Sequence, residues 1–100
     1  MENTEELLIQ IRNSMRISHV KLNDVILDDI EAGALDLKIT GVLPYVMVNE
    51  KCALKKDPLL YKALELYCKW QEDYLGKGEM YEKSYKNLKD AMALCGDYNE

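Results

Sequence analysis

The sequence predicts an all-α domain of four helices, with an extended arm or short strand between the second and third helices. Apolar residues recur at helical spacing in four separate stretches of the chain. Residues 42–56 break this pattern, because Pro44 and the β-branched Val46 and Val48 favour an extended backbone. No repeat or linker divides the chain, so residues 1–100 are predicted to form one domain.

Length and composition are those of one folded unit. A chain of 100 residues, 48% hydrophobic and 31% charged, can bury one core without disulfides or metal, and we expect disorder only at about residues 1–3 and 97–100. The acidic N-terminus and the lack of a long apolar run predict a protein that is neither exported nor held in a membrane. Three well-separated cysteines, Cys52, Cys68 and Cys95, indicate a reducing cytosol, and Cys52 is the candidate exposed thiol.

The first helix is predicted to begin at Thr4, an N-cap followed by two glutamates, and to end near Arg16. The second runs from about Asn23 to Thr40, where Gly41 is placed to end it. Gly33 lies within its main apolar stripe and predicts a close approach of another helix. The predicted apolar faces are Leu7, Leu8, Ile11 and Met15 in the first helix, and Leu22, Ile26, Leu27, Ile30, Ala34 and Leu37 in the second.

A second apolar stripe crosses the polar side of the second helix, formed by Val25, Ala32, Leu35 and Ile39. These residues are either ordinary surface aliphatic residues or a contact with another chain. Residues 42–56 pose a similar choice, because a lone strand cannot satisfy its own backbone hydrogen bonds. This segment either packs as a loop on its own domain or pairs with something outside it, and is the first candidate for a partner-binding element.

The third helix is predicted over Asp57–Leu75, with Asp57 as N-cap and Pro58 in its first turn. Apolar residues cover most of its circumference, so it should be central. Gly76–Lys77–Gly78 predicts a flexible break, and the last helix begins at Glu79 with Gly96 placed to cap its end. The expected apolar face of this last helix is Tyr81, Tyr85 or Ser84, Leu88, Met92 and Cys95.

Catalytic chemistry finds little support in these residues. His19 is the single histidine, and no phosphate loop, nucleophile elbow or paired cysteine motif occurs. Asp24, Asp28 and Glu31 share a helical face and could hold a divalent cation, but a solvated acidic face is the favoured interpretation. We therefore predict no enzyme, and no catalytic, cofactor-binding or metal-binding residue. A net charge of −5 and only two arginines also argue against a DNA reader, although a small helical regulatory or DNA-binding protein stays as the alternative.

Three blocks of sequence resemble the head-tail connector family of tailed double-stranded DNA phages, also called adaptor or DNA-packaging proteins. In residues 15–37 the matching positions are a Met-Arg-Ile turn followed by a helix with an I-x-x-x-I-E-A pattern, where Gly33 replaces the usual alanine. DPLLYKALELYCKW, residues 57–70, is similar to the family's D-P-L-x-x-A-x-x-x-Y-x-K helix. YEKSYKNLKDAM, residues 81–92, is similar to its terminal Y-x-x-L-K helix.

This resemblance implies a structural virion protein, encoded by a phage or prophage and present in the bacterial cytoplasm during assembly. It implies a ring of identical subunits, a dodecamer, that joins the portal protein to the tail-completion or stopper protein after DNA packaging, with DNA passing through the channel unbound. A ring needs two different patches on each subunit. We expect Val25, Leu35 and Ile39 to form one of them, meeting the arm around Val46 and Val48 of a neighbouring subunit.

The acidic balance of the chain suits a channel through which DNA slides, because a lumen that repels phosphates does not trap them. We expect Asp24, Asp28 and Glu31 to line or approach that channel. The purified ring should therefore show no tight binding to a DNA duplex in filter-binding assays at low salt. Tight binding that weakens steeply with added salt, as it does for proteins that neutralise phosphates, contradicts this prediction.

Overall fold

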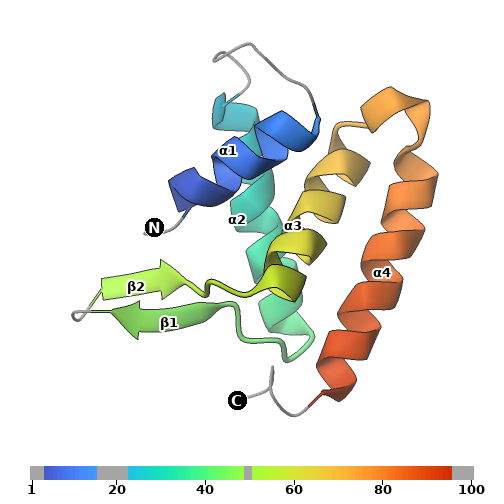
Figure 1. The fold of residues 1–100 in the computed structure, drawn as a ribbon. Coiled ribbons are helices and arrows are strands. Elements are labelled where there is room, and N and C mark those ends of the chain that lie inside the picture. The colour runs from blue at the N-terminus through green and yellow to red at the C-terminus, as the bar shows by residue number, and fades with distance from the viewer. Residues whose placement is uncertain (1–3, 16–22, 49–50, 96–100) are drawn as a thin grey trace.

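The all-α prediction is confirmed by four helices, which a computed structural model describes over residues 4–15, 23–48 and 51–95 (Figure 1). The predictions for the chain ends, for the loop of residues 17–22 with His19, and for Gly96 lie outside these ranges. The elements are α1 (Thr4–Ser14), α2 (Asn23–Ile39), β1 (Tyr45–Val48), β2 (Lys51–Leu54), α3 (Pro58–Gln71), the 3₁₀ turn η2 (Tyr74–Gly76) and α4 (Gly78–Leu94).

Helix α3 is central, as its wide apolar circumference predicts: α1, α2 and α4 all pack against it (Figure 1). Its start follows from local chemistry. Asp57 Oδ1 accepts hydrogen bonds from the backbone N–H groups of Leu59, at 2.8 Å, and Leu60, at 3.1 Å, and Pro58 occupies the first turn without losing an intrahelical hydrogen bond. The buried residues of α3 are Leu60, Ala63, Leu64, Leu66 and Cys68.

Helix α2 packs closely against α3 at Gly33, as predicted, because side chains of α3 fill the space in front of this glycine. A Cβ atom at this position would lie 3.0 Å from Leu64 Cδ2 and 3.0 Å from Tyr67 Cδ1. The predicted stripe is buried at Ile26, Ile30, Ala34 and Leu37, and the predicted face of α1 is buried at Leu7, Leu8, Ile11 and Met15. The predicted cap at Thr4 is not seen, since its Oγ1 has no hydrogen-bond partner among the described residues.

Gly41 ends α2 as the sequence predicts. Its φ of 97° is the left-handed conformation that glycine adopts without strain. Gly41 N–H then donates to the Lys38 carbonyl at 3.1 Å, and Val42 N–H donates to the Leu37 carbonyl at 3.0 Å. Val42 is fully buried, so this turn directs the chain back onto the core before β1 begins.

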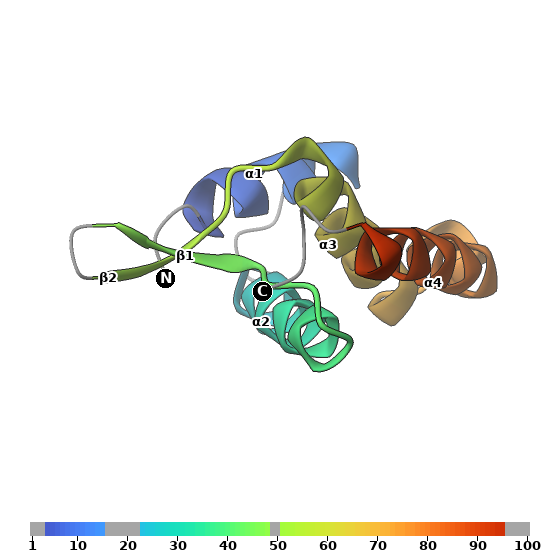
Figure 2. The same ribbon diagram turned by 90° about the horizontal axis from the view of Figure 1, so that it is seen from below.

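Residues 42–56 contain two strands, which form an antiparallel hairpin that projects from the helices (Figure 2). Tyr45 pairs with Leu54 and Val46 with Ala53, and Lys55 N–H extends the ladder to the Pro44 carbonyl at 2.9 Å. The predicted strand is therefore confirmed. The expectation that it must pack as a loop or pair with an outside partner was wrong, because β2 supplies the missing hydrogen bonds.

Helix α3 was predicted to reach Leu75 but ends at Gln71. Asp73 and Leu75 both adopt left-handed φ values, 48° and 56°, which turn the chain back on itself. Asp73 Oδ1 accepts a hydrogen bond of 2.7 Å from Gly78 N–H, and a Cβ atom at Gly78 would lie 2.6 Å from that oxygen. The stretch predicted as a flexible glycine break is thus a closely packed turn, whose side chain–backbone hydrogen bond stops α3 and starts α4.

Helix α4 is tied to the other helices through Tyr85, not through Ser84, the other residue that the periodicity allowed. Tyr85 is fully buried, with its ring centroid 5.3 Å from that of Tyr67, and its hydroxyl donates to Asp36 Oδ2 at 2.5 Å. Lys89 Nζ reaches the same oxygen at 3.1 Å. Although burial opposes ionisation of Asp36, these two donors lower its pKa, so the carboxylate stays charged and joins α2 to α4.

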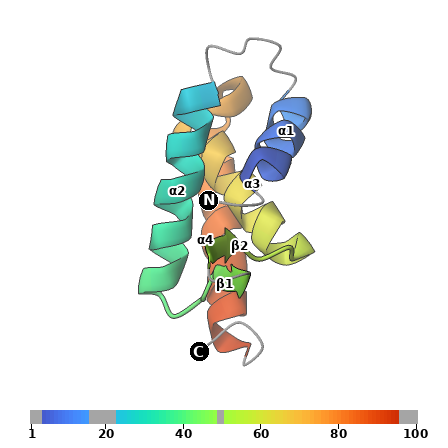
Figure 3. The same cartoon turned by 90° about the vertical axis from the view of Figure 1, so that its left-hand side faces the viewer.

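The four helices form a flat molecule with principal extents of 35 × 31 × 18 Å (Figure 3). Because the shortest extent is only 18 Å, the helices lie mainly side by side and few of them are covered on both faces. Helices α2 and α4 each cover one side of α3, which leaves the opposite face of each without a covering element in the described part of the chain.

The central role of α3 predicts a sharp contrast between two adjacent leucines. Leu60 is 1% exposed and Leu59 is 46% exposed. Leu60→Ala should lower the free energy of unfolding by about 2–5 kcal/mol, because it leaves a cavity in the core. Leu59→Ala, the matched control, should change it by less than about 1 kcal/mol. Urea denaturation of both variants measures the difference, and equal losses contradict the central position of α3.

Candidate functional site

The second apolar stripe of α2 lies exposed on the outer face of that helix. Leu35 is 54% exposed, Ile39 is 83% exposed and Val25 is 40% exposed, and Ala32 lies exposed between them. Their alternating three- and four-residue spacing, with Asp28 completing it, places them along one line. This line is opposite the buried residues of α2, so the face points away from α3. We call Val25, Asp28, Ala32, Leu35 and Ile39 the outer face of α2.

Acidic residues share and border this outer face. Asp28 lies within it, and Asp24 and Glu31 lie at its edge, all three exposed. None of the three has a lysine or arginine within ion-pair distance among the described residues. The sequence placed both the acids and the apolar stripe on the polar side of this helix, and the structure shows both sets exposed there. A partner that covers the apolar residues must therefore also meet the carboxylates.

The hairpin carries the other predicted interface residues. Tyr45 and Leu54 anchor its base in the core, whereas Val46 is 42% exposed. Val48 is at the end of β1, and its side chain lies outside the described ones. Within its own chain the hairpin is a two-stranded sheet whose outer edges pair with no other described strand. The exposed part of the predicted interface thus comes from two elements, α2 and the hairpin.

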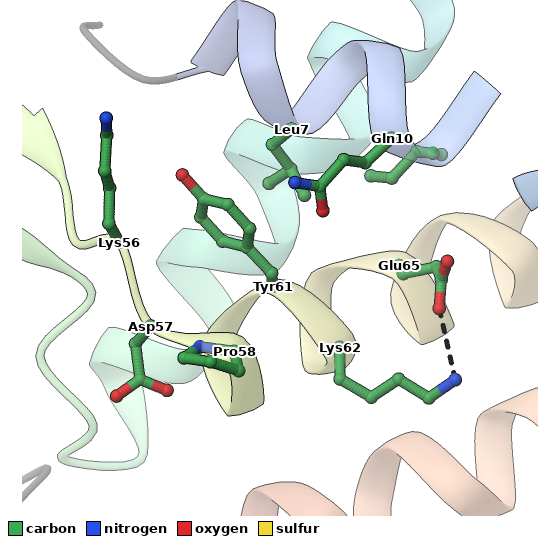
Figure 4. Close-up of a pocket in the computed structure, with 9 residues that line it drawn as sticks. Leu7, Gln10, Lys56, Asp57, Pro58, Tyr61, Lys62 and Glu65 are labelled. Carbon is green, nitrogen blue, oxygen red and sulfur yellow. Dashed lines mark hydrogen bonds and ion pairs between the residues drawn. The ribbon is translucent and has the colours of Figure 1, made fainter. Parts of the chain in front are cut away.

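A pocket of about 410 Å³ opens between α1 and the start of α3 (Figure 4). Figure 4 shows Tyr61 and Leu7 on its apolar side and Lys56 and Lys62 at its edges. The residues that line it are Leu7, Gln10, Ile11, Lys56, Asp57, Pro58, Tyr61, Lys62 and Glu65.

The carboxylates of this pocket are held in structural interactions. Asp57 caps α3, and Glu65 accepts a hydrogen bond of 3.2 Å from Lys62 Nζ. Burial opposes ionisation of Glu65, but hydrogen bonds from Ser14 and Lys62 outweigh it and lower its pKa. Burial and the nearby Glu6 carboxylate raise the pKa of Tyr61. Both groups therefore keep their ordinary protonation states at neutral pH and are not matched as a general acid and base.

Other chemistry-bearing residues are used for packing or lie outside the described chain. Cys68 is fully buried and its pKa is raised by burial, so it packs as a small apolar residue, as the sequence predicts. Cys95, also predicted to lie on an apolar face, is half-buried. The side chain of Cys52 is not among those described. Within the described ranges, no group of three or more His, Cys, Asp or Glu residues could hold a metal ion.

Sequence reasoning missed one acidic pair. Asp29 on α2 lies within hydrogen-bonding reach of Glu72 at the end of α3, and its Oδ2 is buried without a donor from the described residues. Burial, the contact with Glu72 and the charge of Asp28 raise the pKa of Asp29 to about 8. The two carboxyl groups are compatible as neighbours when they share a proton. Only folding brings these residues together, so no spacing in the sequence could have indicated them.

Comparison with protein family models, with curated protein sequences and with solved structures finds no match to this chain. Across the described residues, no helix combines the length and the apolar character needed to cross a lipid bilayer.

The Asp29–Glu72 pair predicts an unusual pH dependence. Because the pKa of Asp29 is higher in the folded state than its ordinary value of 3.8, the folded protein binds this proton more tightly than the unfolded chain does. The contribution to stability is full below about pH 4 and is lost as the pH rises towards 8. Asp29→Asn removes the titration, so its advantage over the wild type should grow between pH 5 and 8.5. Urea denaturation across this range measures the difference, and a pH-independent difference contradicts the pair.

Proposed function

We propose that this chain is a structural assembly protein, the subunit of a head-tail connector ring between the portal and the tail-completion protein of a tailed phage. The observation that carries the proposal is the outer face of α2, an exposed apolar line on a helix whose opposite side already supplies the core. Exposed apolar residues aligned in this way are typical of protein contacts, whereas single scattered ones are not.

Two separate exposed surfaces on the chain support the proposal that it is a ring subunit. A closed ring requires two different surfaces on each subunit, one on either side of the contact. The outer face of α2 and the projecting hairpin are two such surfaces, and they come from different elements. Within the described residues, the three blocks that resemble the connector family fall mainly on α2, on α3 and on α4. In this proposal the ring is a dodecamer, and DNA passes through its channel without specific binding.

Two of the three lysines of α4 give the alternative of a DNA-binding protein no support. Lys86 pairs with Glu82 at 3.1 Å, and Lys89 pairs with Asp36 at 3.1 Å. Both lysines also lie over aromatic rings, Lys86 over Trp70 and Lys89 over Tyr85. Their charges are thus engaged within the protein and do not form the basic stripe by which proteins hold phosphates.

Negative-stain electron microscopy of the purified protein at high concentration tests the proposal. The wild type should form closed annuli with a central hole of the width of a DNA duplex. Leu35→Asp should abolish the annuli, because it places a charge in the contact. Its circular dichroism should match the wild type, since Leu35 is already more than half exposed.

Leu94→Asp is the matched control, the same change at an exposed leucine near the end of α4. This variant should assemble as the wild type does. A wild type that stays monomeric at every concentration, or Leu35→Asp annuli as abundant as those of the wild type, contradicts the proposal.

A further inference from the structure

The outer face of α2 needs an occupant from outside its own chain. Helix α2 forms the left side of the molecule in Figure 3, whereas its own hairpin lies in the middle of the view and projects towards the viewer. The hairpin therefore does not fold back over the outer face of the same copy. We infer that a second copy of this chain covers the outer face with its β1–β2 hairpin, and that lysine at the hairpin base meets the carboxylates of α2. This inference rests on the proposed ring.

Charge favours this occupant. The exposed charged residues of α2 are three acids, Asp24, Asp28 and Glu31, and one lysine, Lys38, a net charge of −2, whereas residues 42–56 carry three lysines and one glutamate, a net charge of +2. Of the described lysines at the hairpin base, Lys56 already pairs with Glu6 at 3.5 Å. Lys55 forms no ion pair with a described residue, as is also true of Asp24, Asp28 and Glu31. Each surface thus supplies the charge that the other lacks.

The hairpin also offers an exposed apolar residue to the exposed apolar residues of the outer face of α2. Val46 lies exposed on β1, one residue after Tyr45, and neighbouring residues of a strand point to opposite faces. Tyr45 therefore faces the core together with its strand partner Leu54, whereas Val46 shares the other face with its partner Ala53, which is already fully buried. Val46 itself stays exposed, so packing its side chain on Leu35 of another copy buries apolar surface of both partners.

The spacing along the two elements gives the contact a register. Lys55 is level with Pro44, two residues from Val46, which is about 7 Å along the strand. On α2, Glu31 lies about 6 Å and Asp28 about 10 Å from Leu35 towards the N-terminus. With Val46 packed on Leu35, the Lys55 side chain can therefore reach Glu31 or Asp28. From Val46, strand β1 then runs towards Ile39.

Charge reversal with rescue tests this register. Lys55→Glu and Asp28→Lys should each raise the protein concentration at half-assembly by about fivefold or more, because an attractive pair becomes repulsive. The double variant restores opposite charges at every contact of the ring and should return this concentration to near the wild-type value. Analytical ultracentrifugation of the full chain measures all four proteins, and added salt should reduce the differences.

Two matched controls carry the same charge changes elsewhere: Lys83→Glu and Asp90→Lys, both at exposed positions of α4. These variants should assemble as the wild type does. The hairpin contact is wrong, while the proposed ring stands, if the wild type forms rings and either single reversal leaves the concentration at half-assembly unchanged. The same conclusion follows if the double variant assembles no more readily than the single variants. In that case a different occupant, such as a basic helix of another protein, covers the face. If the wild type never assembles, both proposals are overturned.

Discussion

The packing of α3 against three other helices is the constraint on which the rest of the structure depends. Its apolar residues cover most of its circumference, so one neighbouring helix cannot shield it from water. Helices α1, α2 and α4 supply that cover, each with an apolar stripe of its own. The result is a layer 18 Å thick in its shortest direction, and a layer this thin cannot bury both sides of the helices that form its edges.

Helix α2 shows the consequence most clearly. Its inner side reaches α3 so closely that Gly33 has no room for a side chain, and Asp36 joins the helix to α4 through Tyr85 and Lys89. These contacts fix the position of α2, so its exposed residues are presented on a rigid support. Rigid presentation lowers the entropy lost on association, which favours the subunit contact proposed above.

The sequence predicted most of the fold because its signals were local. Asp57 and Pro58 mark the start of α3, Gly41 marks the end of α2, and helical spacing identified the buried stripes. The errors came from contacts between elements. Helix α3 stops at Gln71 because the Asp73 carboxylate bonds to Gly78 N–H, although apolar spacing continues through Leu75.

Partners distant in the sequence account for the remaining differences. The second strand was missed because Lys51–Leu54 has little pattern of its own and is defined by its pairing with Tyr45–Val48. Candidate interface residues were found because exposed apolar residues on a polar helix face are visible in sequence. That Asp29 meets Glu72 requires the folded arrangement.

Disulfide trapping between copies tests most directly whether the hairpin of one subunit lies on α2 of the next. Two proteins are mixed, one with Leu35→Cys and one with Val46→Cys, both with Cys52 and Cys95 replaced by serine and with the buried Cys68 retained. The account predicts a disulfide-linked heterodimer under mild oxidation, because only close Cα atoms can be bridged. Pairing Leu35→Cys with Met80→Cys, an exposed position on α4, should give little product. No product with Val46→Cys, or equal yields from both mixtures, contradicts the account.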